Sequence, residues 1–481
     1  MERNSGSGTV LDRYDDSGFD RSGNAETSLR VDSLIINGKK ILVLGLGATG
    51  VSLLSFLSDK GAMVSGFDAV LSEEKTVTIK EKWPQISLYS GVFEDISLDE
   101  YDILALSPGI SSTSEAIVQF KKQGKPVVGD VELFAQQINQ TNSKVIAITG
   151  SNGKSTVITL AGFLCEKAGL KTVVAGNIGL PVLEAWQEHK HDLPDVWVLE
   201  LSSFQLDTTE SLNATAACVL NISEDHLDRY TDLLDYAHSK SRIFSGNGVQ
   251  VLNGDDVFCR AMARAERTHR YFSLQQPTDY WVGEQSGKMA LYEKMDGKII
   301  DVSQLPIQGL HNAANVLAAF ALCEAIGLRK DELLTHLSEF KGLAHRVERV
   351  GEKSGVLFID DSKGTNVGAT CAALAGFTAP ILLIAGGDGK GQDFSPLKPL
   401  LEQKARALFL IGQDARLIEA ACAGIQIPVM HCETLPEATK KAYEMAQSGD
   451  IVLLSPACAS WDMFKNYAHR SEVFIDTFEA L

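Results

Sequence analysis

The 481-residue sequence lacks several features that mark large classes of protein. It has no uninterrupted apolar run of the roughly 20 residues that a membrane-spanning helix needs, so we expect no membrane span. Its N-terminus lacks the apolar core of a secretory signal. Positive charge is scarce, with 44 Lys and Arg against 62 Asp and Glu and a formal net charge of −18. This balance argues against general nucleic-acid binding, although a local basic pocket is still compatible with it.

The sequence also lacks paired cysteines. Its eight cysteines are scattered and include no C-x-x-C pair, which argues against a disulfide framework or a zinc site. Free thiols fit a reducing cytosol, so we expect a cytoplasmic protein. The start of the chain is polar, rich in Ser, Gly, Asp and Arg, and nearly without apolar periodicity. We predict that residues 1–35 form a disordered extension.

The most informative segment is KVIAITGSNGKST, residues 144–156. Its apolar start, residues 145–148, predicts a buried strand, and helically spaced apolar residues from about Ser155 predict a helix. Gly150 and Gly153 lie in the loop between them. Such a unit binds phosphate, because glycines let backbone N–H groups converge on an anion at the positive end of a helix.

The side chains of this loop suit the same chemistry. Lys154 can reach the terminal phosphates of a nucleotide, and the hydroxyl of Ser155 or Thr156 can ligate Mg²⁺. The loop departs at one position from the common pattern G-x-x-x-x-G-K-[ST], because residue 148 is isoleucine. A tight turn that happens to contain Gly-Lys-Ser is the alternative interpretation.

A second glycine-rich turn, GLGATG at residues 45–50, follows a predicted strand at residues 41–44. It matches the fingerprint of dinucleotide-binding folds, and Asp68 ends the next predicted strand, where a ribose-binding acid is expected. Alone, this pattern suggests a nicotinamide-dependent dehydrogenase. However, the glycines explain only a close approach to a diphosphate, which any nucleotide diphosphate supplies. A packing turn without a ligand is a further alternative.

Strands and helices alternate along the chain, which predicts three consecutive α/β domains with mainly parallel sheets. Residues 36–129 and 341–481 are expected to form Rossmann-like domains, and residues 130–340 the central domain with the phosphate loop. Short segments near residues 271–302 predict a small antiparallel patch. Further strands are predicted at residues 101–106, 126–128, 172–174, 196–200, 216–221, 249–252, 356–359, 381–385, 407–411, 428–431 and 451–455.

Polar residues follow several of the central strands. Glu200 closes one strand, at the sheet edge where a Mg²⁺ ligand is needed near a phosphate loop. His226 comes just past another strand, and its imidazole can ligate a divalent ion or contact phosphate. Asn312 and Asn315 share one face of a predicted helix and suit the edge of an adenine, although a helix cap explains Asn312 equally well. Lys240 lies in a helical stretch, and its spacing alone assigns it no role.

Three loops of the third domain carry cations and hydroxyl groups after predicted strands. They are DDSKGTN at residues 360–366, GGDGKG at 386–391, and SPACAS at 455–460, which precedes a helix predicted to start near Ser460. Together they predict a site for an anionic substrate.

The set of motifs resembles the Mur ligases, from about Lys39 to the C-terminus. Its members are TGSNGKST, GNIG, LELSSFQL, EDHLDRY, YAHSKSRIF, HNAAN, HR-x-E, DDSKGTN, GGDGKG and SPACASWDMFKNY. LELSSFQL, DSK-x-TN and SPACAS-x-D-x-F point to the branch that adds D-glutamate to UDP-N-acetylmuramoyl-L-alanine. The resemblance implies an ATP-dependent ligase of cytoplasmic peptidoglycan precursor synthesis, which forms an amide through an acyl phosphate. It also implies one or two Mg²⁺ ions and a monomer that binds no nucleic acid.

The resemblance further implies roles for individual residues. ATP would contact Gly150, Ser151, Asn152, Gly153, Lys154, Ser155, Thr156, Asn312, Asn315, Arg346 and Asp361. The UDP-linked substrate would contact Gly47, Ala48, Thr49, Asp68, Ser107, Gly109 and Asn177. D-Glutamate would contact Lys363, Thr365, Lys390, Ser460 and Tyr467. The metal set would be Ser155, Thr156, Glu200, His226 and a Lys240 carbamylated by CO₂, and the catalytic set Lys154, Glu200, His226 and Lys240.

The sequence departs from the family pattern in a few places. Ala69 and Val70 follow Asp68, where some members place a hydroxyl and an arginine around the uracil. Trp461 replaces a smaller apolar residue, and Ser471 replaces a glycine. The alternatives are another amide ligase of the superfamily, such as a folylpolyglutamate synthetase or a different Mur ligase, a dehydrogenase, and a nucleotide-binding regulatory module without turnover.

Overall fold

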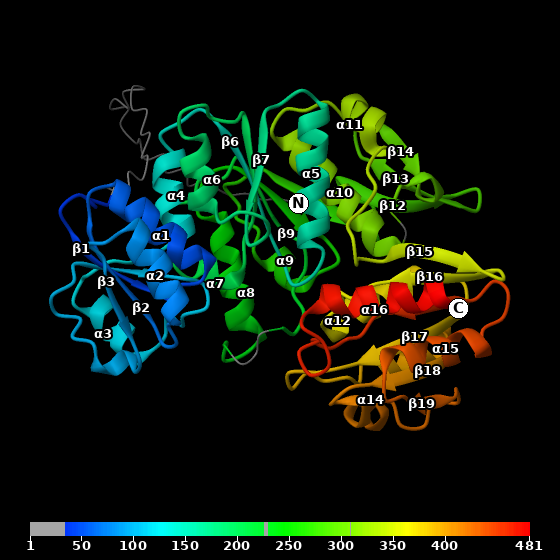
Figure 1. The fold of residues 1–481 in the computed structure, drawn as a ribbon. Coiled ribbons are helices and arrows are strands. Elements are labelled where there is room, and N and C mark those ends of the chain that lie inside the picture. Colours follow the sequence, from blue (N-terminus) through cyan, green and yellow to red (C-terminus); the bar gives the residue numbers. More distant parts are fainter. Residues whose placement is uncertain (1–33, 226–228, 308) are drawn as a thin grey trace, which may run out of the picture. The chain divides into compact units, whose positions relative to one another are not determined.

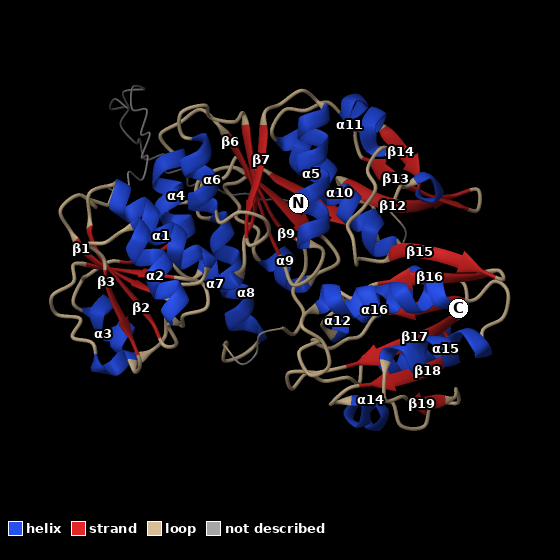
Figure 2. Cartoon of the chain, in the orientation of Figure 1, coloured by secondary structure: helices blue, strands red, loops and turns tan. Residues whose placement is uncertain are grey.

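The computed structural model describes residues 34–225, 229–307 and 309–481, so the predicted extension lies almost entirely outside the described residues. The described chain from Ile35 onward builds three separate sheets, each flanked by helices (Figures 1 and 2). Their strands span residues 40–129, 144–301 and 348–454. Each span falls inside one predicted domain, while the domain boundaries themselves remain predictions. Within the described residues, no helix combines the length and the apolar character needed to cross a bilayer.

The first sheet has five parallel strands in the order β3-β2-β1-β4-β5. Because β1 lies between β2 and β4, the loops that follow these three strands share one edge of the sheet. Strand β3 was not predicted, since it is a short and largely exposed edge strand. The elements are β1 (Lys40–Leu44), α1 (Ala48–Asp59), β2 (Met63–Asp68), α2 (Glu73–Lys82), β3 (Ser87–Ser90), η1 (Phe93–Asp95), β4 (Ile103–Leu106), α3 (Glu115–Lys122), β5 (Val127–Gly129) and α4 (Asp130–Ile138).

The second sheet has nine strands in the order β14-β13-β12-β11-β10-β9-β6-β8-β7. The strands from β7 to β12 are parallel, and β12, β13 and β14 pair antiparallel. The antiparallel patch predicted near residues 271–302 is therefore confirmed for β12 to β14 only, because β11, at its start, pairs parallel with both neighbours. The strands are β6 (Lys144–Thr149), β7 (Thr172–Gly176), β8 (Val196–Glu200), β9 (Ala216–Val219), β10 (Val249–Asn253), β11 (His269–Ser273), β12 (Tyr280–Gln285), β13 (Lys288–Glu293) and β14 (Gly297–Asp301). The helices are α5 (Lys154–Lys167), α6 (Val182–His189), α7 (Ser203–Leu206), α8 (Leu233–Ser241), η2 (Arg242–Phe244), α9 (Val257–Ala261), η3 (Val302–Gln304), α10 (Leu310–Ala325) and α11 (Lys330–Leu337).

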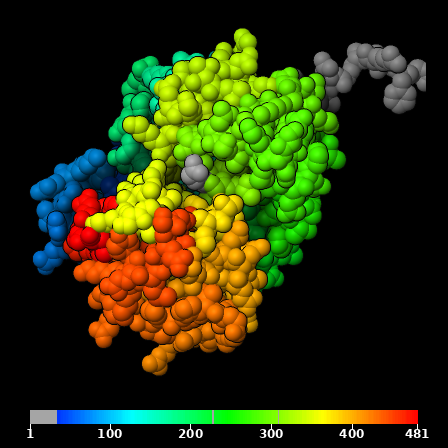
Figure 3. Space-filling model, turned by 90° about the vertical axis from the view of Figure 1, so that its right-hand side faces the viewer, coloured from blue at the N-terminus to red at the C-terminus, as the bar shows by residue number. Residues whose placement is uncertain are grey.

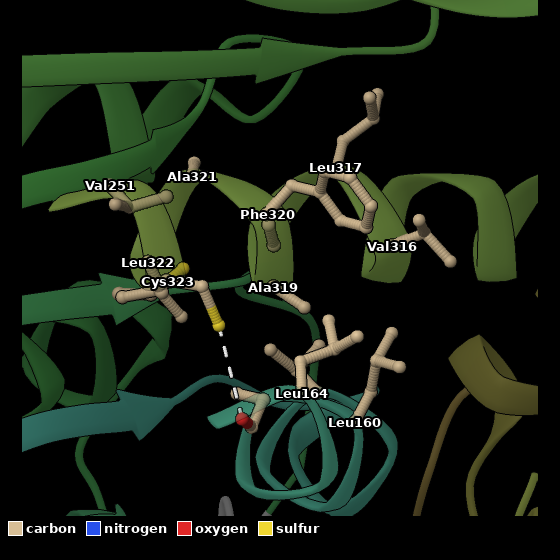
Figure 4. Packing of buried hydrophobic residues seen from close by; sticks show 14 of the residues in the cluster. Leu160, Leu164, Val251, Val316, Leu317, Ala319, Phe320, Ala321, Leu322 and Cys323 are labelled. Carbon is tan, nitrogen blue, oxygen red and sulfur yellow. Dashed lines mark hydrogen bonds between the residues drawn. The ribbon is translucent and has the colours of Figure 1, made fainter. Parts of the chain in front are cut away.

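Helices α5 and α10 share a buried apolar core over the central sheet (Figure 4). Leu160 and Leu164 of α5 and Leu317 and Phe320 of α10 are at most 1% exposed. At the end of this contact the thiol of Cys323 donates to a carbonyl of α5. This packing fixes the start of α5, and with it the phosphate loop, against the sheet.

The third sheet has six strands in the order β15-β16-β20-β17-β18-β19, all parallel except the β15–β16 pair. Its residues are the yellow to red atoms in Figure 3. The elements are β15 (Glu348–Lys353), β16 (Val356–Asp360), α12 (Val367–Gly376), β17 (Ile381–Gly386), α13 (Leu397–Lys404), β18 (Ala405–Ile411), α14 (Ala415–Ala421), β19 (Val429–His431), α15 (Leu435–Met445), β20 (Ile451–Leu454) and α16 (Tyr467–Ala480).

The last helix corrects one prediction. The helix expected from about Ser460 begins only at Tyr467. The side chain of Asn466 accepts a hydrogen bond from the backbone N–H of His469 at 2.8 Å and so caps the helix. Residues 461–466 therefore remain loop, which leaves Ser460 in a loop and Tyr467 at the first turn of a helix. The eight cysteines are all free, as their spacing predicted.

The core of the central sheet provides a stability test. Leu317→Ala removes a fully buried side chain, and we expect the free energy of unfolding to fall by about 2–5 kcal/mol because a cavity is left behind. Met295→Ala serves as the control, since Met295 is 84% exposed in the same domain and should change stability by less than about 0.5 kcal/mol. Urea unfolding followed by tryptophan fluorescence measures both. Equal shifts for the two variants would contradict the packing described.

Candidate active site

The loop between β6 and α5 requires its two glycines. Gly150 and Gly153 have φ angles of 150° and 84°, a region that side chains disfavour. A Cβ on Gly153 would also lie 2.5 Å from Oδ1 of Asn315. Gly153 precedes the first residue of α5, so the free N–H groups of this helix face the loop. The geometry is that of an anion-binding loop.

Lys154 folds back over this loop. Its Nζ donates to the carbonyl oxygens of Gly150 and Ser151, at 2.8 Å each. Burial lowers the pKa of Lys154, and the charges of Arg346 and Lys363 lower it further, against opposing effects of nearby carboxylates. A cation in this position is bonded only weakly by neutral carbonyls and is repelled by its cationic neighbours. A polyanion in the loop would relieve both conditions.

Two further cations approach the same loop. The guanidinium of Arg346 donates to Oγ of Ser155 at 3.0 Å, although the two residues are 191 apart in sequence. Lys240 is 1% exposed, and its Nζ lies 3.3 Å from Oγ1 of Thr149 at the end of β6. Burial lowers the pKa of Lys240 far below its usual range, and the charge of Lys154 adds to the effect. Lysine side chains and an arginine thus converge on the start of α5.

Glu200 ends β8, next to the phosphate-loop strand β6. The carboxylate is 3% exposed, and its Oε1 accepts a hydrogen bond from Nδ2 of Asn177 at 2.9 Å. Its Oε2 is buried with no hydrogen-bond partner among the described residues. An unpartnered buried carboxylate oxygen is costly, and a hard cation would satisfy it. These residues therefore fit a divalent metal ion.

His226, the other predicted metal ligand, lies outside the described residues. The predicted metal ligands also include Ser155 and Thr156, in addition to Lys240. Their hydroxyls are in the first turn of α5, and both residues are buried.

A cavity of about 310 Å³ adjoins the phosphate loop. It brings together residues that were predicted from distant motifs, namely Asn152, Gly153, Thr156, Asn312, Asn315, Arg346, Asp361 and Lys363. Nδ2 of Asn315 donates to Oδ1 of Asn312 at 3.0 Å, so the two amides share a face as predicted. The alternative that Asn312 caps its helix is wrong, because Gly309 occupies the cap position of α10.

The cavity also contains residues that sequence reasoning missed. Asn221 and Ser223 follow β9, Asn253 ends the neighbouring strand β10, and Phe272 is the last but one residue of β11. Their common position after parallel strands was the signal that could have identified them. Oδ1 of Asn221 accepts the backbone N–H of Asn152 at 2.8 Å and so helps to fix the phosphate loop.

His311 is a further missed residue in the wall of this cavity. Burial lowers its pKa to about 4, although a hydrogen bond to the backbone of Ala372 in α12 opposes that shift. The imidazole is therefore neutral at physiological pH. It lies against Gly309 and Gly376, where a Cβ would come within 3.2 Å of its Nδ1.

Most residues predicted for the UDP-linked substrate gather at one edge of the first sheet, but Asn177 follows β7 of the central sheet and contacts Glu200. Oδ2 of Asp68 accepts the N–H of Leu46 at 2.8 Å and thereby holds the glycine turn that includes Gly47, Ala48 and Thr49. Ser107 follows the adjacent strand β4. The carbonyl of Gly109 accepts a hydrogen bond from Arg229 at 3.0 Å, a contact that the sequence did not indicate.

The residues predicted for D-glutamate lie on loops of the third domain, except Tyr467, which begins α16. Nζ of Lys363 lies 3.0 Å from the hydroxyl of Tyr467 and 4.4 Å from its ring centroid. The loops that carry Lys390 and Ser460 pair through backbone hydrogen bonds between Asp388 and Ala459. Lys390 is exposed, whereas Ser460 is 3% exposed. Thr365 lies in the same loop as Lys363.

Three family models match the chain in succession. The Mur ligase MurD-like N-terminal domain matches residues 39–129, the Mur ligase middle domain residues 148–323, and the Mur ligase glutamate ligase domain residues 345–458. The chain belongs to the Mur ligase family. This membership confirms the resemblance inferred from the motifs, and it places the phosphate loop in the family's middle domain.

Relatives of high identity extend over nearly the whole chain. The UDP-N-acetylmuramoylalanine–D-glutamate ligase of Chromobacterium violaceum is 55% identical over 446 residues, 92% of this chain and 98% of its own. The same-named ligase of Thiobacillus denitrificans is 50% identical over 94% of this chain and 98% of its own. Among solved structures, the MurF ligase of Thermotoga maritima in complex with ADP shares the fold, with a TM-score of 0.59 and 16% identity over 92% of this chain and 95% of its own.

Asp361 makes the stability of the free protein depend on pH. Burial raises its pKa from 3.8 to about 7, so the folded protein binds a proton there that the unfolded chain has already released. The free energy of unfolding should therefore fall as pH rises from about 4 to about 7, with a slope of at most about 1.4 kcal/mol per pH unit from this group.

Asp361→Asn should remove that contribution, because an amide does not titrate. Urea unfolding of the ligand-free protein at several pH values measures the two slopes. If the variant and the parent protein lose stability equally across this range, the assignment to Asp361 is wrong.

Proposed function

We propose that this protein joins D-glutamate to the alanyl carboxylate of UDP-N-acetylmuramoyl-L-alanine at the expense of ATP. The observation that carries the proposal is the convergence of Lys154, Arg346 and Lys240 on a phosphate loop. The loop belongs to a Mur ligase, and relatives named UDP-N-acetylmuramoylalanine–D-glutamate ligase match nearly its full length. The nucleotide substrates support a place in cytoplasmic peptidoglycan precursor synthesis. We expect the protein to act as a monomer.

The reaction needs ATP because a carboxylate is a poor electrophile without a leaving group. A carboxylate oxygen of the alanyl group attacks the γ-phosphorus, the bond to the β-phosphate oxygen breaks, and ADP leaves. The amine of D-glutamate then attacks the carbonyl carbon of the acyl phosphate and loses a proton. Collapse of the tetrahedral intermediate breaks the C–O bond and releases inorganic phosphate.

The residues of the phosphate loop supply most of what such a transfer requires, which is positioning and charge stabilisation. Backbone N–H groups at the start of α5 would face the phosphates, and Lys154 would exchange its two carbonyl partners for phosphate oxygens. Arg346, held on the hydroxyl of Ser155, contributes a second cation from beyond the central sheet. Asn312 and Asn315 face the cavity, where they can read the edge of the adenine.

Magnesium fits the site on its donor chemistry. Glu200 offers a buried oxygen without a partner, and Ser155 and Thr156 offer hydroxyls, with His226 proposed as a further ligand. When bound, Mg²⁺ neutralises charge on the phosphate oxygens.

Lys240 is proposed to be carbamylated by CO₂. Carbamylation requires a neutral amine, and burial favours that form of this side chain. The amine nitrogen forms a bond to the carbon of CO₂ and loses a proton, which converts a repelled cation into a carboxylate-like anion beside Lys154. Loading the protein with ¹³C-labelled CO₂ and recording a carbamate resonance, absent in Lys240→Arg, tests this directly.

Substrate specificity would be divided between the two outer sheets, with Asn177 contributing from the central sheet. Gly47, Ala48, Thr49, Asp68, Ser107, Gly109 and Asn177 would bind the UDP-linked substrate, and Lys363, Thr365, Lys390, Ser460 and Tyr467 the D-glutamate carboxylates. The function is tested by phosphate release from ATP in the presence of UDP-N-acetylmuramoyl-L-alanine with D-glutamate, L-glutamate or other amino acids, and with folates. Release that depends on D-glutamate supports the proposal. Release with folates, or ATP binding without turnover, would favour an alternative.

Lys154→Ala should lower kcat by about 10²–10³, because one preorganised donor to the transferred phosphoryl group is lost. The control is Lys441→Ala on α15, whose lysine pairs with Glu437 on the same helix. Steady-state phosphate release measures both, and melting curves establish that both fold. A Lys154 variant with unchanged turnover would contradict the assigned role.

Three substrates bound to three domains require closure, so we expect a rigid-body movement of the third domain about residues 341–346 when ATP and the UDP-linked substrate bind. His345 and Val347, on either side of Arg346, have φ angles of 64° and 49°, which is unusual for residues other than glycine. Small-angle scattering with and without both ligands measures the movement. Identical scattering curves would contradict it.

A further inference from the structure

The segment of residues 361–366, which carries Lys363 and Thr365, is held on one side by its own sheet. Oδ2 of Asp361 accepts the hydroxyl of Ser455 at 2.7 Å. The hydroxyl of Ser362 donates to the carbonyl of Tyr467 at 2.8 Å and accepts from Nε of Arg470 at 3.0 Å. These contacts hold the segment against the third sheet, but none of them reaches the phosphate loop.

The side-chain amide of Asn366, at the end of this segment, makes two hydrogen bonds in different directions. It is 6% exposed, and its Oδ1 accepts the backbone N–H of Ala369 at 2.8 Å, which caps α12. Because that N–H requires an acceptor, Oδ1 of the amide must face α12, and its Nδ2 therefore points away from α12. Nδ2 donates to Oδ1 of Asn152 in the phosphate loop at 3.1 Å, across 214 residues of sequence.

The partner, Asn152, is itself firmly placed. Its backbone N–H donates to Oδ1 of Asn221 at 2.8 Å, and its carbonyl accepts from Nδ2 of the same residue at 3.1 Å. Its own Nδ2 donates to Oγ of Ser223 at 3.3 Å. Asn366 therefore contacts a side chain that moves only if the phosphate loop moves.

The first turn of α12 is shaped for this approach. A Cβ on Gly368 would lie 3.1 Å from Nδ2 of Asn152 and 3.1 Å from Oγ of Ser223, closer than side chains normally pack. Glycine inside a helix costs up to about 1 kcal/mol relative to alanine, so its presence here needs a reason. Close contact with the phosphate loop supplies that reason.

We propose that Asn366 is a positioning residue that couples the phosphate loop to the amino-acid-binding segment. Through its contact with Asn152, the position that the phosphate loop takes on a bound nucleotide also sets the position of Lys363 and Thr365 for the incoming amino acid. By reciprocity, the amino acid then strengthens nucleotide binding by the same factor. The inference rests on the proposed function, since it takes D-glutamate and ATP as the two ligands.

Asn366→Asp separates this role from helix capping. Aspartate retains an oxygen for the N–H of Ala369 and suits a helix N-terminus, but it offers no donor to Oδ1 of Asn152. The thermal midpoint should stay close to that of the parent protein. We expect kcat/KM for D-glutamate to fall on the order of tenfold at saturating ATP, within the range of typical couplings between sites.

Two measurements make the test decisive. The first is the factor by which a non-hydrolysable ATP analogue tightens D-glutamate binding in the presence of UDP-N-acetylmuramoyl-L-alanine, which should exceed one in the parent protein and approach one in Asn366→Asp. The second is a double-mutant cycle on kcat/KM with Asn152→Ala, Asn366→Ala and the double variant. If the contact carries the effect, the double variant loses little more than the more impaired single variant.

The outcomes are distinguishable. Losses that multiply in the cycle, or an unchanged coupling factor in Asn366→Asp, would overturn the positioning role while the parent protein still releases phosphate with D-glutamate. If the parent protein itself shows no D-glutamate-dependent release, the proposed function fails, and this inference fails with it.

Discussion

The structure depends on one electrostatic constraint, which is that several cationic side chains lie close together in a poorly solvated site. Lys154 is repelled by Arg346 and Lys363, and Lys240 is repelled by Lys154. The pKa of each of the two buried lysines falls as a result of burial and of this repulsion. Nearby carboxylates, among them Glu200 and Asp225, offset part of this repulsion, and a polyanion in the loop would offset more of it. The apolar contact of α5 with α10 helps to hold the phosphate loop next to these cations.

One topological rule places many of the candidate groups, although Lys240, Asn312 and Asn315 come from helices. In a parallel sheet the loops at the carboxyl ends of the strands lie along one edge, and all three sheets are mainly parallel. Asp68 and Ser107 follow β2 and β4, Glu200 ends β8, and the segment of residues 361–366 follows β16. The chemistry of each sheet edge differs, since the first offers backbone amides and a carboxylate, the second cations and a buried carboxylate oxygen without a partner among the described residues, and the third a lysine and hydroxyls. A single building principle therefore produces three candidate sites with different chemistry.

The sequence predicted the buried parts of the fold well and the exposed parts less well. Strands such as β6 and β8 are continuous apolar runs, and their position relative to the glycine loop identified the phosphate site and Glu200. Strands β3, β12 and β15 are short or partly exposed, so they carry no comparable pattern, and the start of α16 depends on the single capping residue Asn466. The contacts of Asn366 with Asn152 and of Arg229 with Gly109 join residues far apart in sequence, and no local pattern encodes them. The roles of the individual site residues remain predictions.

The position of Lys154 shows how the loop can be ordered without a ligand and still bind one. In the free protein its two carbonyl partners, from Gly150 and Ser151, satisfy the ammonium group with neutral oxygens, and the carboxylates of Glu200 and Asp225 offset part of the cost of its burial. Hydrogen bonds to a phosphate are charge-assisted and stronger than those to a neutral carbonyl, so the exchange of partners favours binding. The anion would also offset the burial that lowers the pKa of this lysine, so we expect nucleotide binding to raise that pKa. In the proposed function, the loop therefore holds its lysine in place until a phosphate replaces the two carbonyls.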